Sequence, residues 1–251
     1  MTAGPTRTTR VRTLPGLSNI RDAQNLRGPG GRFLRPELLL RGPAPPNGMG
    51  VLVALGVRTV VDLRTASERS GGRSGSHGGG DGGVHVLHRP VQADTRMLLG
   101  PPWPGPGAYL AHYRLLVPVA APIASEVVAL VAAGTAAPIY VCCTAGKDRT
   151  GVVLALALRA LDVRLADIAR DYALTARAYR VSSPGTPPLP WAASYGQAEL
   201  AARTASLERT IRALVHEIEQ TWRSVRALLE HHGLPDEAWQ AARAAAFTGA
   251  P

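Results

Sequence analysis

Short apolar runs alternate with helical patterns along this chain. Such runs occupy 38–41, 57–64, 84–88 and 137–141, and the first three are preceded by glycine or a charged residue. Continuous apolar runs of this length, rich in Val, Ile and Leu, are typical of strands that are buried on both faces of a parallel sheet. The pattern therefore predicts an α/β fold with a central, mainly parallel sheet flanked by helices, and a further short β element at 17–22.

Helical periodicity accounts for much of the remaining chain. In the segment 198–229 the apolar residues recur at helical spacing, at Leu200, Leu207, Ile211, Leu214, Ile218 and Trp222. We interpret this stripe as a face that packs on the core or forms a lid, in preference to a surface for a coiled-coil partner. Other helices are predicted at 49–55, 109–116, 122–133, 152–161, 166–179 and 235–247.

Length and composition favour one domain. A chain of 251 residues is long enough to bury a sizeable core. Residues 1–15 are expected to form a flexible leader, and residues 16–251 a single domain in which 180–251 is a helical extension and a candidate lid. The stretch 70–83 contains eight glycines and is expected to be a surface loop.

Charge and hydropathy narrow the expected partners. The net charge is +10, but the arginines are scattered and no basic stripe with interleaved aromatics occurs, so we expect no specific nucleic-acid partner. No uninterrupted apolar run reaches the roughly 18 residues of a spanning helix, and the N-terminus lacks the apolar core of a signal peptide. We therefore expect a cytoplasmic protein without a transmembrane segment; the sequence leaves its oligomeric state open.

The stretch Val141–Gly151 carries the candidate chemistry. It joins the apolar run 137–141 to the apolar segment 152–161, so a strand, a tight loop and a helix N-terminus are expected to follow one another. Backbone N–H groups converge at such a turn and favour an anion. The spacing Cys143-x5-Arg149 adds a nucleophile at the base of this anion site and a bidentate cation at its rim, as attack on a phosphate monoester requires.

Each residue of the loop has an expected role. Thiols beside cations and at helix N-termini are deprotonated near neutral pH, so Cys143 is expected to attack phosphorus in line and form a phosphocysteine. Lys147 is expected to steady the phosphate or to hold Asp148, and Thr150 either donates a hydrogen bond to the thiolate or is a plain first-turn helix residue. The expected phosphate-binding residues are Thr144, Ala145, Gly146, Lys147, Asp148 and Arg149.

The leaving oxygen needs a proton, and three aspartates are candidates for its donor. Asp148 ranks first because it lies in the loop itself. Asp94 follows the run 84–88. Asp62 ends the run 57–64 and is expected mainly to orient Arg149 or another cation.

Competing chemistries fit this stretch less well. The chain has two cysteines, and because they are adjacent they provide neither a structural zinc site nor a disulfide between distant segments. A Walker loop requires glycine where Val141 stands and serine or threonine where Asp148 stands. Sulfur transfer also uses a thiol in an anion site, but closure of the loop by Arg149 favours phosphate.

On these residues the chain resembles the bacterial tyrosine-phosphatase-like family, whose signature is His-Cys-x-Ala-Gly-Lys-Asp-Arg-Thr-Gly. Mycobacterial members of that family act on phosphotyrosine, phosphoserine or phosphothreonine, and phosphoinositides. Asn19-Ile20-Arg21-Asp22 is similar to the family's Asn-Phe-Arg-Asp, Arg41 to its Arg-Ser strand end, Gly56–Arg64 to its Asp-Leu-Arg segment, and Asp171-Tyr172 to its Asp-Tyr helix. The resemblance covers most of the chain.

The resemblance implies a cysteine-phosphatase-like fold that needs no metal or cofactor. It implies catalytic roles for Cys143, Lys147, Asp148 and Arg149. Supporting roles are expected for Thr150, Cys142, Asp62, Arg64, Arg41 and Asp94.

Departures from the family pattern surround an intact loop. Cys142 stands where the family has a histidine that helps to set the loop and the thiolate, Ala23-Gln24 replaces Gly-Gly, and Gly42 replaces serine. Such drift indicates a changed substrate more than a dead enzyme. A smaller hypothesis is redox control, in which Cys142 forms a vicinal disulfide with an oxidised Cys143.

The sequence thus predicts a cysteine-dependent phosphomonoesterase. Its substrate stays open between a phosphoprotein or phosphoinositide, the family default, and a small phosphorylated metabolite such as a nucleotide-like or sugar-like biosynthetic intermediate. The alternative from a different class is a pseudophosphatase, in which the change at Cys142 leaves a phosphate-binding module without turnover.

Overall fold

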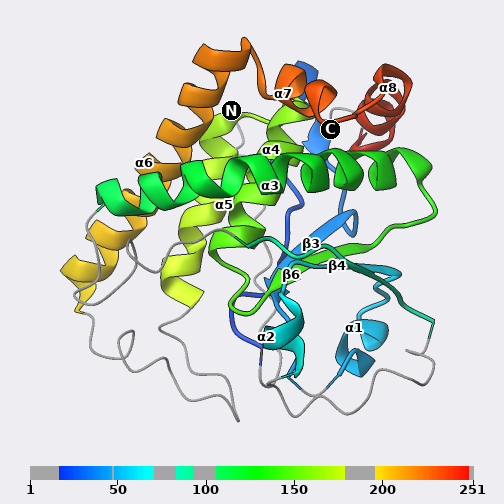
Figure 1. The fold of residues 1–251 in the computed structure, drawn as a ribbon, viewed down its shortest axis with the longest axis horizontal. Coiled ribbons are helices and arrows are strands. Elements are labelled where there is room, and N and C mark those ends of the chain that lie inside the picture. Colours follow the sequence, from blue (N-terminus) through cyan, green and yellow to red (C-terminus); the bar gives the residue numbers. More distant parts are fainter. Residues whose placement is uncertain (1–16, 47, 71–82, 93–105, 179–195, 249–251) are drawn as a thin grey trace, which may run out of the picture.

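The central strand of the fold is β6, Ile139–Cys143, which ends at the loop 144–147. In the computed structural model, which describes residues 17–46, 48–70, 83–92, 106–178 and 196–248, β6 lies in the middle of a five-stranded sheet (Figure 1). The strand order is β1-β3-β6-β4-β5, with bounds Arg21–Asp22 (β1), Leu39–Pro43 (β3), Thr59–Asp62 (β4) and His85–His88 (β5). Within this sheet β1 alone is antiparallel to its neighbour, so the predicted, mainly parallel sheet is confirmed.

Helices cover both faces of the sheet (Figure 1). One face packs against the longest helices of the first two thirds of the chain, which are α3 Pro106–Ala133, α4 Asp148–Ala160 and α5 Leu165–Ala178. The short helix α1, Gly50–Ala54, lies against the other face. Another short helix, α2 at Ala66–Ser70, lies beside the loop that follows β6.

The C-terminal helices are an addition to this core. They are α6 Gln197–Trp222, α7 Val225–His231 and α8 Asp236–Ala245, and they pack on α3, α4 and α5. Leu207, Ile211 and Leu214 of α6 are buried in the same hydrophobic cluster as α3 and α4, so the interpretation of the apolar stripe as a core face is confirmed. The lid role of this extension stays a prediction.

Two hydrophobic clusters lie on opposite faces of β6. Ile139, Val141 and Cys143 belong to the cluster under α3 and α4, whereas Tyr140 and Cys142 belong to the cluster under α1. This division follows from the alternation of side chains along a strand. The two adjacent cysteines therefore face different layers of the molecule.

Two predicted helix boundaries were wrong. The segments 109–116 and 122–133 form one continuous helix, α3, that contains Pro118 and Pro122. Packing of its buried face on the core outweighs the two backbone hydrogen bonds that proline removes. The segment 198–229 is instead two helices, because Arg223 adopts a left-handed φ of +64° that ends α6, and Ser224 then caps α7 by accepting a hydrogen bond from the Ala227 N–H at 3.0 Å.

A small second sheet was not predicted. Phe247–Thr248 (β7) pairs antiparallel with Phe33–Leu34 (β2), close to a 3₁₀ turn at Pro29–Gly31. Strands of two residues leave no periodicity to detect. The predicted leader 1–15, most of the glycine-rich stretch 70–83, and Asp94 lie outside the described residues.

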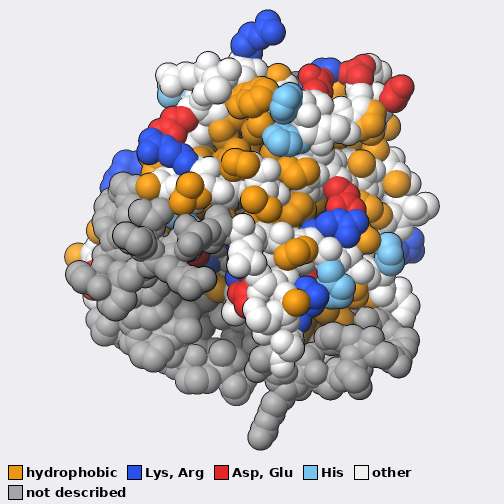
Figure 2. Space-filling model, in the orientation of Figure 1, with side chains coloured by type: hydrophobic (Ala, Val, Ile, Leu, Met, Phe, Trp, Pro, Cys, Tyr) orange, Lys and Arg blue, Asp and Glu red, His pale blue; other side chains and the backbone are white. Residues whose placement is uncertain are grey.

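One helix, α3, has the length and apolar composition of a membrane span over Tyr109–Ala133, with a mean hydropathy of 2.1. Half of that window is buried inside the protein, as in the core helix of a globular domain. The other part of α3 shows hydrophobic side chains at the surface, where Leu115 is 46% exposed (Figure 2). The structure thus gives no clear transmembrane segment among the described residues.

We predict that Gly151→Ala destabilises the protein, although Gly151 lies inside α4. Helix propensity alone favours alanine by about 1 kcal/mol, but a Cβ there would lie 2.4 Å from Cε2 of the buried Tyr172 ring. Overpacking of this kind costs about 1–3 kcal/mol, so the free energy of unfolding, measured by urea denaturation, is expected to fall by about 1 kcal/mol. Gly50→Ala in α1, where a Cβ meets nothing within 4 Å, is the control. A Gly151→Ala protein more stable than the wild type would contradict this packing.

Candidate active site

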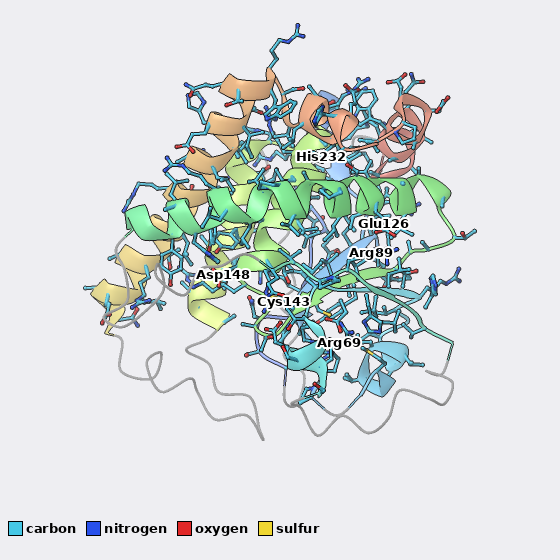
Figure 3. The ribbon with its side chains drawn as sticks, in the orientation of Figure 1. Arg69, Arg89, Glu126, Cys143, Asp148 and His232 are labelled. Carbon is cyan, nitrogen blue, oxygen red and sulfur yellow. The ribbon has the colours of Figure 1, made fainter. Side chains whose placement is uncertain are left out.

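The predicted order of strand, loop and helix is confirmed in the stretch around Cys143. β6 ends at Cys143, residues 144–147 turn, and α4 begins at Asp148. Cys143 is 2% exposed and lies on the sheet face that carries α3 and α4. Figure 3 shows Cys143 and Asp148 at the same end of the sheet, below α3. The turn therefore brings the thiol to the N-terminus of a 13-residue helix, the position where backbone N–H groups favour an anion.

Close contact between two backbones fixes this loop on the sheet. Gly146 has a left-handed φ of +62°, and a Cβ on it would lie 2.2 Å from the carbonyl carbon of Gly42 in β3. At the start of the loop, the N–H of Ala44, the residue that follows β3, donates to the Cys143 carbonyl oxygen at 2.8 Å. Glycine at position 146 is therefore a requirement of the turn and of the approach to β3.

Arg149 is held by a carboxylate that the sequence analysis missed, Glu68 of α2. Its Nη1 donates to Glu68 Oε2 at 2.7 Å and its Nη2 to Oε1 at 2.6 Å, while the Thr144 hydroxyl donates to Oε1 at 2.7 Å. Hydrogen bonding by Arg149 holds the pKa of Glu68 well below its usual range, so Glu68 is ionised at neutral pH. The sequence did contain a signal for this role, because Glu68 lies only six residues past the end of β4, at the sheet edge where the carboxyl ends of the parallel strands meet. The guanidinium at the rim is thus fixed in one orientation.

Asp62 does not orient Arg149. It is fully buried and accepts hydrogen bonds from Arg64, at 3.0 Å from Nε to Oδ1 and 2.8 Å from Nη2 to Oδ2. Of the two alternatives in the sequence prediction, the other cation is therefore the one observed. This pairing raises the pKa of Arg64 against the opposing effect of its burial.

Asp148 is held by a tyrosine and a lysine. The Tyr113 hydroxyl of α3 donates to Asp148 Oδ1 at 2.6 Å, and Lys147 Nζ lies 3.6 Å from the same oxygen. Burial and the nearby Asp148 raise the pKa of Tyr113, so its hydroxyl stays protonated as a donor. Lys147 also donates to the Tyr109 hydroxyl at 3.0 Å. The contact of Lys147 with Asp148 agrees with one of its two predicted roles, and the tyrosines of α3 were not predicted.

Behind the loop lies a buried charged cluster made of Arg21, Arg41 and Asp171. Arg21 Nε lies 2.9 Å from Asp171 Oδ1, and Arg41 Nη1 lies 3.2 Å from Oδ2. Burial raises the pKa of the Asp171 carboxyl, but the two arginines outweigh it and the pKa is lowered, so Asp171 is ionised at neutral pH. The residues that the sequence linked only by resemblance are thus brought together from β1, β3 and α5.

Cys142 and Cys143 lie in different environments. Cys142 is fully buried on the α1 side of the sheet, and burial together with Asp62 raises the pKa of its thiol well above the ordinary value. Cys142 is therefore a neutral core residue at physiological pH. Because adjacent side chains of a strand point to opposite faces, a vicinal disulfide with Cys143 requires β6 to leave its extended conformation, and the redox hypothesis loses its support.

Two further side chains near the loop each have a buried polar atom without a hydrogen-bond partner within the described part of the chain. The Thr150 hydroxyl oxygen is one, and the structure leaves both of its predicted roles open. The other is Nδ1 of His112 on α3, a residue that sequence reasoning missed. Burial lowers the pKa of His112, so its imidazole is neutral at physiological pH.

Grouped metal-binding side chains are absent from the described residues. Over the residues that the structure describes, no three His, Cys, Asp or Glu side chains are grouped as a metal ion requires. The arrangement around Cys143 instead offers a thiol, a fixed guanidinium, a helix N-terminus and a carboxylate that is held by Tyr113. These groups together suit nucleophilic attack on a phosphate ester followed by proton transfer.

Comparison with known proteins supports a phosphatase. A model of the tyrosine phosphatase family matches residues 12–247, which is nearly the whole chain. No curated protein matched the sequence. The family match supports a phosphatase function in general terms: the chain belongs to the tyrosine phosphatase family.

Proposed function

We propose that this phosphatase is a cysteine-dependent phosphomonoesterase that forms a phosphocysteine at Cys143. The observation that carries the proposal is the position of Cys143 at the end of β6, against the N-terminus of α4, with Arg149 fixed by Glu68. The general alternative, a binding module without turnover, needs a defect in this arrangement. The Cys143 thiol, the α4 N-terminus, the Arg149 guanidinium and the Asp148 carboxylate support turnover in preference to binding alone.

In the first step the Cys143 sulfur attacks phosphorus, and the bond from phosphorus to the leaving oxygen breaks. Negative charge on the transferring phosphoryl group is met by the N–H groups of the loop and by the α4 N-terminus. A guanidinium has five N–H donors, and Glu68 uses two of them on Arg149. Longer bonds run from Nη1 to the Leu63 carbonyl oxygen, at 3.4 Å, and from Nη2 to the Thr144 hydroxyl, at 3.3 Å. A phosphate oxygen can replace these weaker partners or accept from Nε, which makes no hydrogen bond within the described part of the chain.

Asp148 is the proposed general acid and base. Its proton passes to the leaving oxygen in the first step, and in the second step its carboxylate accepts a proton from the water that attacks the phosphocysteine. Water oxygen then replaces sulfur on phosphorus, which releases phosphate and regenerates the thiolate. Tyr113 and Lys147 fix the orientation of Asp148. Asp94, outside the described residues, is the rival for this role.

We propose a phosphorylated protein or phosphoinositide as substrate, with a small phosphorylated metabolite as the alternative, and a cytoplasmic location. The family description supports an aryl phosphate ester such as phosphotyrosine. A phosphate-release screen over phosphopeptides, phosphoinositides, and nucleotide and sugar phosphates separates these classes. Turnover of one class at least tenfold above the others would identify it.

Cys143→Ser is expected to lower turnover of a generic aryl phosphate at least about a thousandfold, because the alkoxide that would replace the thiolate is not formed at neutral pH. The assay is phosphate release under reducing conditions. Cys142→Ala is the matched control: it removes the neighbouring thiol on the opposite sheet face and is expected to keep most of the activity. Activity that survives Cys143→Ser contradicts the mechanism. A wild type that binds phosphate or vanadate without turnover would establish the pseudophosphatase instead.

Glu68→Gln is expected to lower kcat/KM about 10- to 100-fold, because Arg149 loses the charged partner that fixes its orientation. Steady-state kinetics on the same aryl phosphate measures this loss. Glu126→Gln is the control, since Glu126 forms a similar bidentate pair with Arg89, at 2.6 and 2.7 Å, away from the loop (Figure 3). Equal kcat/KM for Glu68→Gln and wild type would show that Arg149 needs no anchor.

Asp148→Asn is expected to lower kcat for phosphate esters, and to lower it more when the leaving group is more basic. An alkyl phosphate needs a proton on its leaving oxygen, whereas a nitrophenyl phosphate does not, so kcat should fall about a hundredfold for the former and far less for the latter. Asp94→Asn is compared in the same assay. If that variant shows the selective loss and Asp148→Asn does not, Asp94 is the general acid.

A further inference from the structure

Two carbonyl oxygens of the loop face a buried amide on the side of β1 and β3. Nδ2 of Asn19 donates to the Gly146 carbonyl oxygen at 2.9 Å and to that of Ala145 at 3.3 Å. Arg41 Nη2 donates to the Gly146 oxygen as well, at 3.2 Å. Asn19 and Arg41 are each 2% exposed, so these bonds are shielded from water.

Because the peptide unit is planar, these hydrogen bonds to the carbonyl oxygens also fix the direction of the N–H groups that follow. In a trans peptide the C=O and the N–H of the following residue point in opposite directions. With the carbonyls of Ala145 and Gly146 held toward Asn19, the N–H groups of Gly146 and Lys147 point the other way. That direction is away from Asn19 and Arg41, toward the side of the loop that those two residues leave open.

The orientation of the Asn19 amide is itself determined. Its Oδ1 accepts a short hydrogen bond from Nη1 of Arg21, which can only donate, so Nδ2 is the group that faces the loop. Arg21 is in turn held by Asp171, and Asn19 has a left-handed φ of +66°, a conformation that asparagine tolerates better than most residues. The amide therefore has one orientation and one backbone position.

The buried cluster behind these carbonyls carries a net positive charge. Arg21 and Arg41 share the single carboxylate of Asp171, which leaves one formal charge uncompensated among the three. Burial, and then the neighbouring Arg21, lower the pKa of Arg41 to about 10, so Arg41 remains protonated at neutral pH. A cation on the carbonyl side polarises the peptide units and strengthens their N–H groups as anion donors.

We propose that Asn19 and Arg41 are positioning residues that aim the N–H groups of Gly146 and Lys147 at the phosphate and so set the affinity of the site for phosphate oxyanions. Neither side chain touches the substrate; both act through the loop backbone. The inference rests on the proposed function for the identity of the loop as a phosphate site. It adds the requirement that residues outside the loop orient the loop N–H groups, which Cys143 and Arg149 do not do.

The test is the binding of inorganic phosphate to the full-length protein, measured by titration calorimetry beside thermal unfolding. Asn19→Gly removes the amide and accepts the left-handed backbone, and it is expected to raise the Kd for phosphate about tenfold, the loss of one or two buried hydrogen bonds. Asn19→Asp, which places a carboxylate against the carbonyls and cancels the net charge, is expected to weaken binding further. Asn25→Gly is the matched control, because Asn25 has φ of +67° and makes no hydrogen bond to the loop carbonyls.

A purely structural role for Asn19 predicts a lower Tm with an unchanged Kd in the folded protein, and that result would overturn the proposal. If Asn19→Gly does not fold, Arg41→Lys replaces it in the same measurements of Kd and Tm. This variant keeps the positive charge but loses the planar pair of donors, and it is expected to raise the Kd for phosphate about threefold. Phosphate binding requires no turnover, so a wild type that binds phosphate without hydrolysing esters refutes the proposed function and leaves this inference testable. A wild type that binds no phosphate overturns the inference.

Discussion

The proposed anion site at the turn from β6 into α4 requires that the backbone dipoles of the turn are held in one direction. A loop of four residues has no regular hydrogen bonds of its own, so its carbonyl oxygens need partners on the outer side while its N–H groups face inward. Asn19 and Arg41 supply those partners for Ala145 and Gly146. The close approach of Gly146 to Gly42 fixes the loop on β3 at the same place. The Cys143 thiol and the Arg149 guanidinium can act on one phosphate group only if the loop backbone between them is fixed.

Four arginines near the loop, Arg149, Arg64, Arg21 and Arg41, are paired with carboxylates, and the pairing keeps each of them in its own position. Arg149 is held by Glu68 at the rim, and Arg64 by Asp62 at the end of β4. Arg21 and Arg41 share Asp171 beneath the loop. Buried charges require such partners, and removing one partner leaves an uncompensated charge that is costly. Because each of these arginines is held by its carboxylate, several cations can lie near the proposed anion site while Arg149 lies at its rim.

Local sequence patterns were sufficient to predict the sheet and the loop and to single out Cys143 as the candidate nucleophile, because strand, turn and helix follow one another within Ile139–Ala160. Contacts between distant segments were not predictable in this way. Glu68 lies on a five-residue helix with no marked pattern, and Tyr113 belongs to a helix whose periodicity indicates only a core face. Asn19, Arg41 and Asp171 were noted by resemblance, but only the strand order β1-β3-β6 places the first two beside the loop. The continuity of α3 through two prolines and the break of α6 at Arg223 depend on packing and on one left-handed residue, which propensity does not reveal.

The most direct test of the central claim is to trap the intermediate. The wild-type protein is mixed with an aryl phosphate labelled in its phosphoryl group, quenched in acid during turnover, and digested for peptide mapping. The account predicts that the label is bound through sulfur on the peptide that contains Cys143, and that it is absent when Cys143 is replaced by serine. Label on an aspartate or serine side chain, or turnover without any labelled peptide, would contradict it.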